Sequence, residues 1–93
     1  QALSRLKDAL PLDNLVNKFK SFNCNCINVQ NGHSFNQIIS SFKKKLKKGK
    51  PTVVVLNTIK GKGIKEFEND PVWHARKLQG KEIFIGKKRL GIK

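Results

Sequence analysis

The sequence predicts an α/β fold, and within that class a fragment of a doubly wound, mainly parallel sheet. The predicted elements alternate as helix, strand, helix, strand with short joints, which is the order of a βαβ crossover. The second strand-like run, PTVVVLNT at 51–58, is almost continuously apolar. Such a run is typical of a strand buried on both faces of a parallel sheet. Because two strands make no complete sheet, we expect a larger domain or a partner chain to cover this strand.

The first predicted pair of elements is a helix followed by a strand. Apolar residues at 12, 15, 16, 19 and 22 predict a one-sided helix over 11–22, with Pro11 in its first turn. The run NCNCINVQ at 23–30 is short and partly β-branched, which predicts a strand. Cys24 and Cys26 would lie on the same side of that strand without disulfide geometry, and we expect them to hold no metal.

The second helix is predicted from its first residues. Ser34 and Gln37 have the spacing of a capping box, and apolar residues follow at 35, 38, 39, 42 and 46. Gly49 is expected to end this helix. The loops VQNGHS and TIKGKG then follow the two strands, at the strand ends where open α/β sheets bind ligands.

The length and composition restrict the class of protein. A chain of 93 residues with 38% hydrophobic content makes at most one small domain. No apolar run approaches the roughly 18 residues that span a bilayer, and the first ten residues lack the apolar core of a signal peptide. We therefore expect a cytoplasmic protein with no membrane partner. The chain does not begin with Met, so we expect it to be a piece of something longer.

The charge is strongly basic, with 20 Lys and Arg against six acids and a net charge of +14. Such a field attracts polyanions. The run KKKLKKGK at 43–50 is either a patch for nucleic acid or a membrane surface, or the solvated end of a helix. No aromatic residue is interleaved with these lysines to stack on bases, which favours the solvated helix end.

The stretch after the second strand carries the candidate chemistry. KGKG at 60–63 offers accessible backbone beside two ammonium groups, which suits a phosphate as well as it suits a mobile basic loop. His74 follows Trp73 and lies two residues before Arg76. A site that combines phosphate binding with proton transfer is as reasonable here as a structural histidine.

These residues together resemble a known family. KPTVVVLNTIKGKGIKEFENDPVWHARKL at 50–78 closely resembles the end of the diphosphate-binding domain of transketolases, and the match of order, gaps and the Trp-His pair is specific. Upstream, LDNLVNKFKSFN and VQNGHSFNQIISSF resemble the helix and the turn-plus-helix that precede it. The resemblance implies a thiamine diphosphate-binding fold over 1–78, with 79–93 as a basic C-terminal extension outside the family's pattern. Within that extension, EIFI is strand-like and is followed by a glycine turn.

The resemblance also implies roles for three residues. Lys60 matches a family residue near the thiamine diphosphate cofactor. His74 matches a catalytic histidine near the cofactor diphosphate and the sugar substrate, where it bonds the substrate and assists proton transfer. Arg76 stands where the family commonly has a Lys that binds the diphosphate, and the change keeps the charge and adds a bidentate fork.

Some family features are replaced or are expected elsewhere. Asn31 and Ser34 replace the two acids that usually flank Gly-His, so we treat His33 as structural. The Gly-Asp-Gly metal motif and the glutamate that activates the cofactor are not in this sequence, so the ligands of Mg²⁺ or Ca²⁺ are expected outside it. They would belong to the remainder of the enzyme or to a second subunit that carries the pyrimidine-binding domain.

The resemblance implies a magnesium- and thiamine diphosphate-dependent transferase of the pentose phosphate pathway. It would move a two-carbon ketol unit between sugar phosphates in a dimeric assembly, and this fragment alone would be inactive. Two alternatives stay open at this point. One is a small basic nucleic-acid-binding module, and the other is a non-catalytic relative of transketolase.

Overall fold

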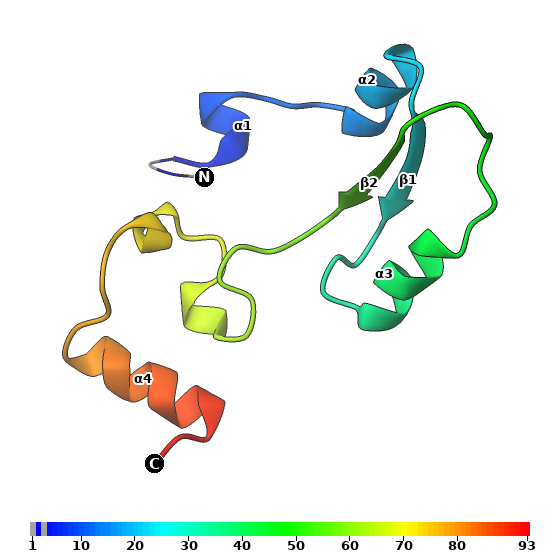
Figure 1. Cartoon of the computed structure of the whole chain (residues 1–93). Helices are drawn as coiled ribbons and strands as arrows, with labels where there is room; N and C mark the ends of the chain where they lie inside the picture. Colours follow the sequence, from blue (N-terminus) through cyan, green and yellow to red (C-terminus); the bar gives the residue numbers. More distant parts are fainter. Residues whose placement is uncertain (1, 3) are drawn as a thin grey trace. The chain divides into compact units, whose positions relative to one another are not determined.

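The structure is a computed structural model that describes residues 2 and 4–93. The chain divides into two units, each described here by itself. The first, called the strand unit, is residues 12–58. The second, called the loop unit, is residues 59–93 together with the described residues of 1–11. Figure 1 shows the elements along the chain.

The strand unit is a small α/β arrangement built around two parallel strands. β1 and β2 pair in parallel with Ile27 opposite Val54, and α3 connects them, so the predicted βαβ crossover is confirmed. The strands are shorter than predicted by one or two residues at each end. The bounds are α2 at Leu15–Ser21, β1 at Asn25–Val29, α3 at Phe35–Phe42 and β2 at Thr52–Leu56.

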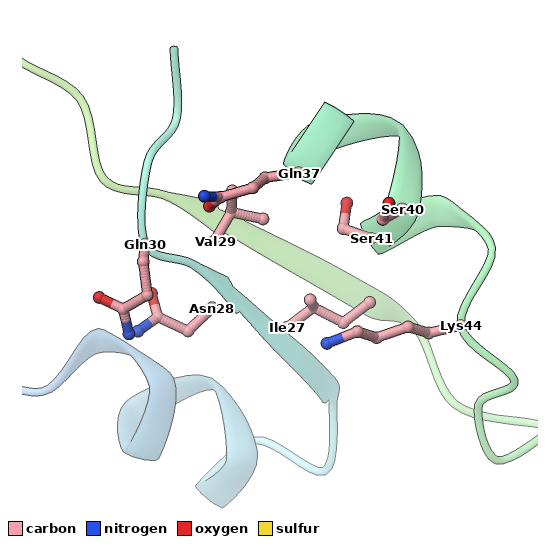
Figure 2. Close-up of a pocket in the computed structure, with 8 residues that line it drawn as sticks. All are labelled: Ile27, Asn28, Val29, Gln30, Gln37, Ser40, Ser41 and Lys44. Atoms are coloured by element: carbon pink, nitrogen blue, oxygen red, sulfur yellow. The ribbon is translucent and has the colours of Figure 1, made fainter. Parts of the chain in front are cut away.

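The two helices cover opposite faces of this pair of strands. Ile27 and Val29 are 5% and 4% exposed and form the core of the unit on the side of α3, as Figure 2 shows. Asn28 points the other way, because successive side chains of a strand alternate between faces. It lines a separate hollow with Leu15 and Val16 of α2. One strand therefore carries a helix on each side, as α/β sheets require.

α2 begins later than the sequence predicted. The side chain of Asn14 accepts a hydrogen bond from the Asn17 N–H at 3.0 Å, which makes Asn14 the N-cap. Asn is among the strongest N-cap residues, so it sets the start of the helix four residues after Pro11. The prediction that Pro11 lies in the first turn was wrong. Phe22, expected on the apolar face, is the C-cap and is 77% exposed.

α3 begins where it was predicted, although only half of the capping box forms. The Ser34 hydroxyl accepts from the Gln37 N–H at 3.4 Å. The Gln37 side chain does not return this bond to Ser34. Instead, the side-chain oxygen of Gln37 accepts a hydrogen bond from the Asn31 N–H at 2.9 Å, in the loop before the helix. Gln37 therefore fixes the loop after β1 to the start of α3.

α3 ends at Phe42, and the prediction that it runs on to Gly49 was wrong. The Lys43 N–H bonds the Ser40 carbonyl, which is the tighter pattern of a helix end. Repulsion among the lysines that follow disfavours a further helical turn. These lysines lie in turns and irregular backbone and are exposed up to residue 49, so they are solvated but follow the helix rather than form its last turn.

The strand unit leaves much apolar surface open. β2 was expected to be buried on both faces, but its middle residues are only half-buried and Leu56 is 40% exposed. Phe35 and Phe42 on α3 are 80% and 74% exposed. Because the part of the chain that the structure describes has two strands, β2 lacks the neighbours that would bury it. Cys24 and Cys26 are free and half-buried.

The loop unit consists of short helices joined by turns. Its bounds are α1 at Leu6–Ala9, the 3₁₀ helices η1 at Lys65–Phe67 and η2 at Pro71–His74, and α4 at Lys81–Leu90. Within residues 2 and 4–93, none of the helices combines the length and the apolar content needed to cross a membrane.

The expected strand EIFI is wrong, because these residues lie inside α4. The helix is specified by its two ends. Glu82 in the first turn and the basic residues of the last turn match the helix dipole. Gly91 then adopts the left-handed conformation with φ +66, and the Ile92 N–H bonds the Lys87 carbonyl, which closes the helix.

Candidate functional site

The lysine–glycine loop after β2 folds back onto η2. Lys60 is half-buried, and its Nζ donates to the Pro71 carbonyl at 3.3 Å. The Lys60 carbonyl accepts from the Asn69 N–H at 2.9 Å. Both the backbone carbonyl and the side-chain ammonium group of Lys60 are therefore hydrogen-bonded to residues at or just before the start of η2. The ammonium group thus has a defined place in the loop unit.

Gly61 permits the tightest approach in this loop. It has φ +76, and a Cβ at this position would lie 2.5 Å from the Phe67 carbonyl oxygen. A side chain would collide with backbone there, so only glycine fits. Lys62 and Glu68 form an ion pair at 3.4 Å across the same turn. The loop is thus closed on η1 by a backbone contact and an ion pair.

Trp73, the only tryptophan of the chain, lies between an aromatic ring and a cation. Its ring centroid is 4.6 Å from that of Phe67, at a tilt of 46°. The guanidinium carbon of Arg76 lies 4.4 Å from the Trp73 ring centroid, which is a cation–π contact. The indole Nε1 is buried and has no hydrogen-bond partner among the described residues. Trp73 therefore provides the flat surface on which Arg76 rests.

Arg76 also forms an ion pair with Glu82 in the first turn of α4. The second oxygen of Glu82 accepts from the Gln79 N–H at 3.0 Å. These hydrogen bonds, the one from Arg76 first, hold the pKa of Glu82 below its ordinary value, so it is ionised at neutral pH. The sequence reasoning missed Glu82, although its three-residue spacing from Gln79 resembles a capping contact.

α4 packs on the same loop through Gly86. This glycine is buried, and a Cβ there would meet Ile64, Leu78 and Phe67 at 3.8 to 3.9 Å. A second ion pair joins Arg89 near the end of α4 to Glu66 in η1. The predicted basic extension is therefore a helix attached to the candidate site by packing and by two ion pairs.

η2 carries the last predicted site residue, His74. The helix begins at Asp70, whose carboxylate accepts from the Val72 N–H at 3.0 Å, with Pro71 at the first position. His74 is its final residue and is exposed. An open hollow of about 680 Å³ lies beside η2, and of the three predicted site residues Arg76 lines it while Lys60 and His74 do not. Lys60, His74 and Arg76 thus lie in one unit: His74 ends η2, while Lys60 and Arg76 contact η2 residues from outside the helix.

The turn after β1 belongs to the strand unit. The Asn31 side chain accepts from the His33 N–H at 3.0 Å, which closes the turn, and His33 is exposed. The Asn57 Nδ2 donates to Asn28 Oδ1 at 2.7 Å and to the Val29 carbonyl at 2.8 Å. Asn57 thereby ties the carboxyl ends of both strands together. Sequence reasoning did not single it out, although a polar residue directly after an apolar strand was the available signal.

The strand unit offers less for chemistry than the loop unit. The hollow in Figure 2 has a volume of about 200 Å³ and is floored by Ile27 and Val29, and Lys44 is the one ionisable residue among those that line it. Residues 2 and 4–93 contain no group of three or more His, Cys, Asp or Glu side chains placed to hold a metal ion. The loop unit therefore holds the candidate site.

Comparison with known proteins identifies the family. The family model described as "Transketolase, thiamine diphosphate binding domain" matches residues 7–93, which is most of the chain. The chain belongs to the transketolase family. The match runs to residue 93, so the family model includes the extension at 79–93 that sequence reasoning had placed outside the family's pattern. The boundary predicted at residue 78 stays a prediction.

Curated transketolases and transketolase subunits are similar to this family member. An apulose-4-phosphate transketolase subunit of Actinobacillus succinogenes is 32% identical over 84 residues, which are 90% of this chain and 30% of that protein. The 6-deoxy-6-sulfo-D-fructose transketolase subunit SqwG of Clostridium sp. (strain MSTE9) is 36% identical over 69 residues, which are 73% of this chain and 25% of that protein. The transketolase of Buchnera aphidicola subsp. Schizaphis graminum is 33% identical over 82 residues, which are 87% of this chain and 12% of that protein. This chain spans between 12% and 30% of the length of these relatives.

Proposed function

We propose that this chain supplies one wall of the cofactor site in a thiamine diphosphate-dependent transferase that moves a two-carbon ketol unit between sugar phosphates. The observation that carries the proposal is the arrangement around η2. The ammonium group of Lys60 donates a hydrogen bond to Pro71, the first residue of η2. The guanidinium of Arg76 lies over the ring of Trp73, and His74 is the last residue of this helix. Membership of the transketolase family supports this function over a basic nucleic-acid-binding module.

The donor chemistry of this wall fits a diphosphate. The ammonium of Lys60 has three N–H donors and the planar guanidinium of Arg76 has five. Each charge-assisted hydrogen bond to a phosphate oxygen contributes roughly 1.5 to 3 kcal/mol. Arg76 is already oriented by Trp73 and Glu82, so less side-chain entropy is lost when it binds an anion. We assign Lys60 and Arg76 to the cofactor diphosphate.

His74 is the residue that we assign to catalysis and to the substrate. His74 is exposed at the end of η2, two residues before Arg76. There it would also contact the cofactor, hydrogen-bond a hydroxyl of the sugar and pass a proton to or from it. Thiamine diphosphate, when bound, supplies the stabilisation of the two-carbon carbanion.

The rest of the enzyme must supply what this chain does not hold. We propose that the ligands of Mg²⁺ or Ca²⁺, the activating glutamate and the pyrimidine-binding domain come from the remaining sequence or from a second subunit, in a dimeric, cytoplasmic enzyme of the pentose phosphate pathway. Two similar proteins are named as subunits, which supports a partner polypeptide. The exposed apolar surface of β2 and α3 supports a larger, doubly wound sheet around it.

The test uses the complete enzyme with this chain in place. His74→Ala is expected to lower kcat, and Arg76→Ala is expected to raise the Kd for thiamine diphosphate by roughly tenfold, as the loss of one charge-assisted bond implies. Arg89→Ala is the matched control, because it removes an ion-paired arginine of the same unit outside the proposed site. Kinetics and cofactor affinity that stay unchanged in both site variants would overturn the assignment. An enzyme that binds cofactor normally and has no turnover would instead identify a non-catalytic relative.

A further inference from the structure

We propose that Glu82 is a positioning residue that holds Arg76 in the orientation required to bind the cofactor diphosphate. The inference rests on the proposed function, since it assumes that Arg76 binds that group. What it adds is a role for α4, which carries Glu82 in its first turn. The extension that follows the Trp-His pair would thereby become part of the cofactor site.

The carboxylate of Glu82 is itself fixed. One oxygen pairs with the Arg76 guanidinium, and the other accepts from the Gln79 N–H at 3.0 Å. The Glu82 N–H returns a bond to the Gln79 carbonyl at 3.0 Å, so the two residues form a reciprocal pair at the start of α4. The Glu82 side chain is 26% exposed, against 41% for Arg76. The carboxylate is therefore the more firmly placed partner of this ion pair.

Arg76 is held at two of its surfaces. Trp73 supports one face of the guanidinium at 4.4 Å from the ring centroid, and Glu82 binds at its edge. A planar group fixed at one face and one edge has its plane and its rotation defined. Without Glu82 the guanidinium would be free to rotate on the indole, and binding an anion would cost additional side-chain entropy.

α4 has attachments besides the ion pair of Glu82. Gly86 packs against Ile64, Leu78 and Phe67, and Arg89 pairs with Glu66 at the other end of the helix. Removal of the Glu82 carboxylate should therefore leave α4 in place and affect Arg76. Glu66 offers a matched control, because it is a second acid that pairs with an arginine across the same contact.

The first measurement is the Kd for thiamine diphosphate in the complete enzyme. Glu82→Ala is expected to raise it roughly three- to tenfold, within the range of pairwise coupling energies, while Glu66→Ala leaves it unchanged. Glu82→Gln, which keeps an acceptor for Gln79 and a neutral bond to Arg76, should recover part of the loss. In an Arg76→Ala background Glu82→Ala should have no further effect, because its action passes through Arg76.

The second measurement needs no cofactor. Trp73 is the only tryptophan, so indole fluorescence of the 93-residue chain reports the cation on its face. Glu82→Ala and Arg76→Ala should both change the emission, and Glu66→Ala should not.

The outcomes separate the two proposals. Equal effects of Glu82→Ala and Glu66→Ala, tighter cofactor binding without Glu82, or a full additional loss in the Arg76→Ala background would each overturn the role of Glu82 alone. An unchanged Kd in Arg76→Ala would overturn the proposed cofactor role of Arg76, and with it the effect of Glu82 on cofactor binding. The fluorescence would still show whether Glu82 holds Arg76 in place.

Discussion

The backbone N–H of Gly32 donates to the carbonyl oxygen of Asn57 over 2.8 Å, and this bond joins the loops that follow β1 and β2. A Cβ on Gly32 would lie 2.9 Å from that same oxygen and 2.8 Å from Thr58 Cγ2. The two loops therefore meet at a distance that no side chain at position 32 allows.

Gly32→Ala should consequently destabilise the strand unit. The added methyl group meets backbone, which cannot move aside as a flexible side chain would, and such overpacking costs about 1 to 3 kcal/mol. Chemical denaturation of the chain would measure the loss. Gly86→Ala is the contrasting variant, because its Cβ finds ordinary contacts at 3.8 Å and alanine favours a helix by about 1 kcal/mol. Equal stability changes in the two variants would contradict this account.

Gly61→Ala should disrupt the lysine–glycine loop through two separate effects. The residue has φ +76, which costs a non-glycine residue about 1 kcal/mol, and its Cβ would approach the Phe67 carbonyl to 2.5 Å. Gly49 has nearly the same φ, +77, with nothing within 4 Å, so Gly49→Ala measures the backbone cost alone. Gly61→Ala should be the more destabilising in urea, and Trp73 fluorescence should change only in this variant. A loss no larger than that of Gly49→Ala would show that the loop tolerates the methyl group.

Asn57→Ala should weaken the connection between the two strands. It removes both hydrogen bonds that the side chain gives to Asn28 and Val29, at a cost of about 1 to 3 kcal/mol in unfolding free energy. Asn57→Asp keeps the shape but places a carboxylate against two acceptor oxygens, so it should be at least as destabilising. Asn36→Ala, at an exposed position on α3, serves as the control in the same denaturation series. If Asn57→Asp retained full stability, the hydrogen bonds donated by the Asn57 side chain would not contribute to the unfolding free energy.

Acid should loosen the contact between α4 and the loop. The hydrogen bonds from Arg89 and from Arg76 hold the pKa values of Glu66 and Glu82 below the ordinary value of 4.5. A carboxyl group with a lowered folded pKa contributes its stability above that ordinary value and loses it as the pH falls through the folded pKa. Trp73 fluorescence followed from neutral pH downward should stay constant to about 4.5 and change below it.

The variants Glu66→Gln and Glu82→Gln assign this acid transition. Because Trp73 reports on Arg76, Glu82→Gln should abolish the fluorescence transition, while Glu66→Gln should leave it in place. An acid transition that stayed unchanged in Glu82→Gln would contradict this assignment.

The sequence allowed the strand unit to be predicted because its signals are local. An apolar β-branched run predicts β2, and a serine with the correct spacing predicts the start of α3. Where prediction failed, a nearby residue decided the structure. Asn14 caps α2 in place of Pro11, and α3 ends at Phe42, where a run of lysines begins.

The loop unit was harder to predict because its structure depends on contacts between segments. The alternation of EIFI over four residues favours a strand, while the helix is specified by Glu82 and Gly91 at its two ends. The candidate residues Lys60, His74 and Arg76 came from resemblance and local motif, and their roles stay predictions. The pairing of Arg76 with Glu82, and the surface that Trp73 gives to Arg76, are tertiary contacts that no local pattern specifies.

The two-stranded sheet has a practical consequence for handling this chain. Each strand has a neighbour on one side, so β1 and β2 each present a row of backbone donors and acceptors at the outer edge. Identical copies can pair through such edges. Coproduction with the rest of the enzyme should therefore raise the soluble yield, since correct neighbours would occupy those edges before self-association begins.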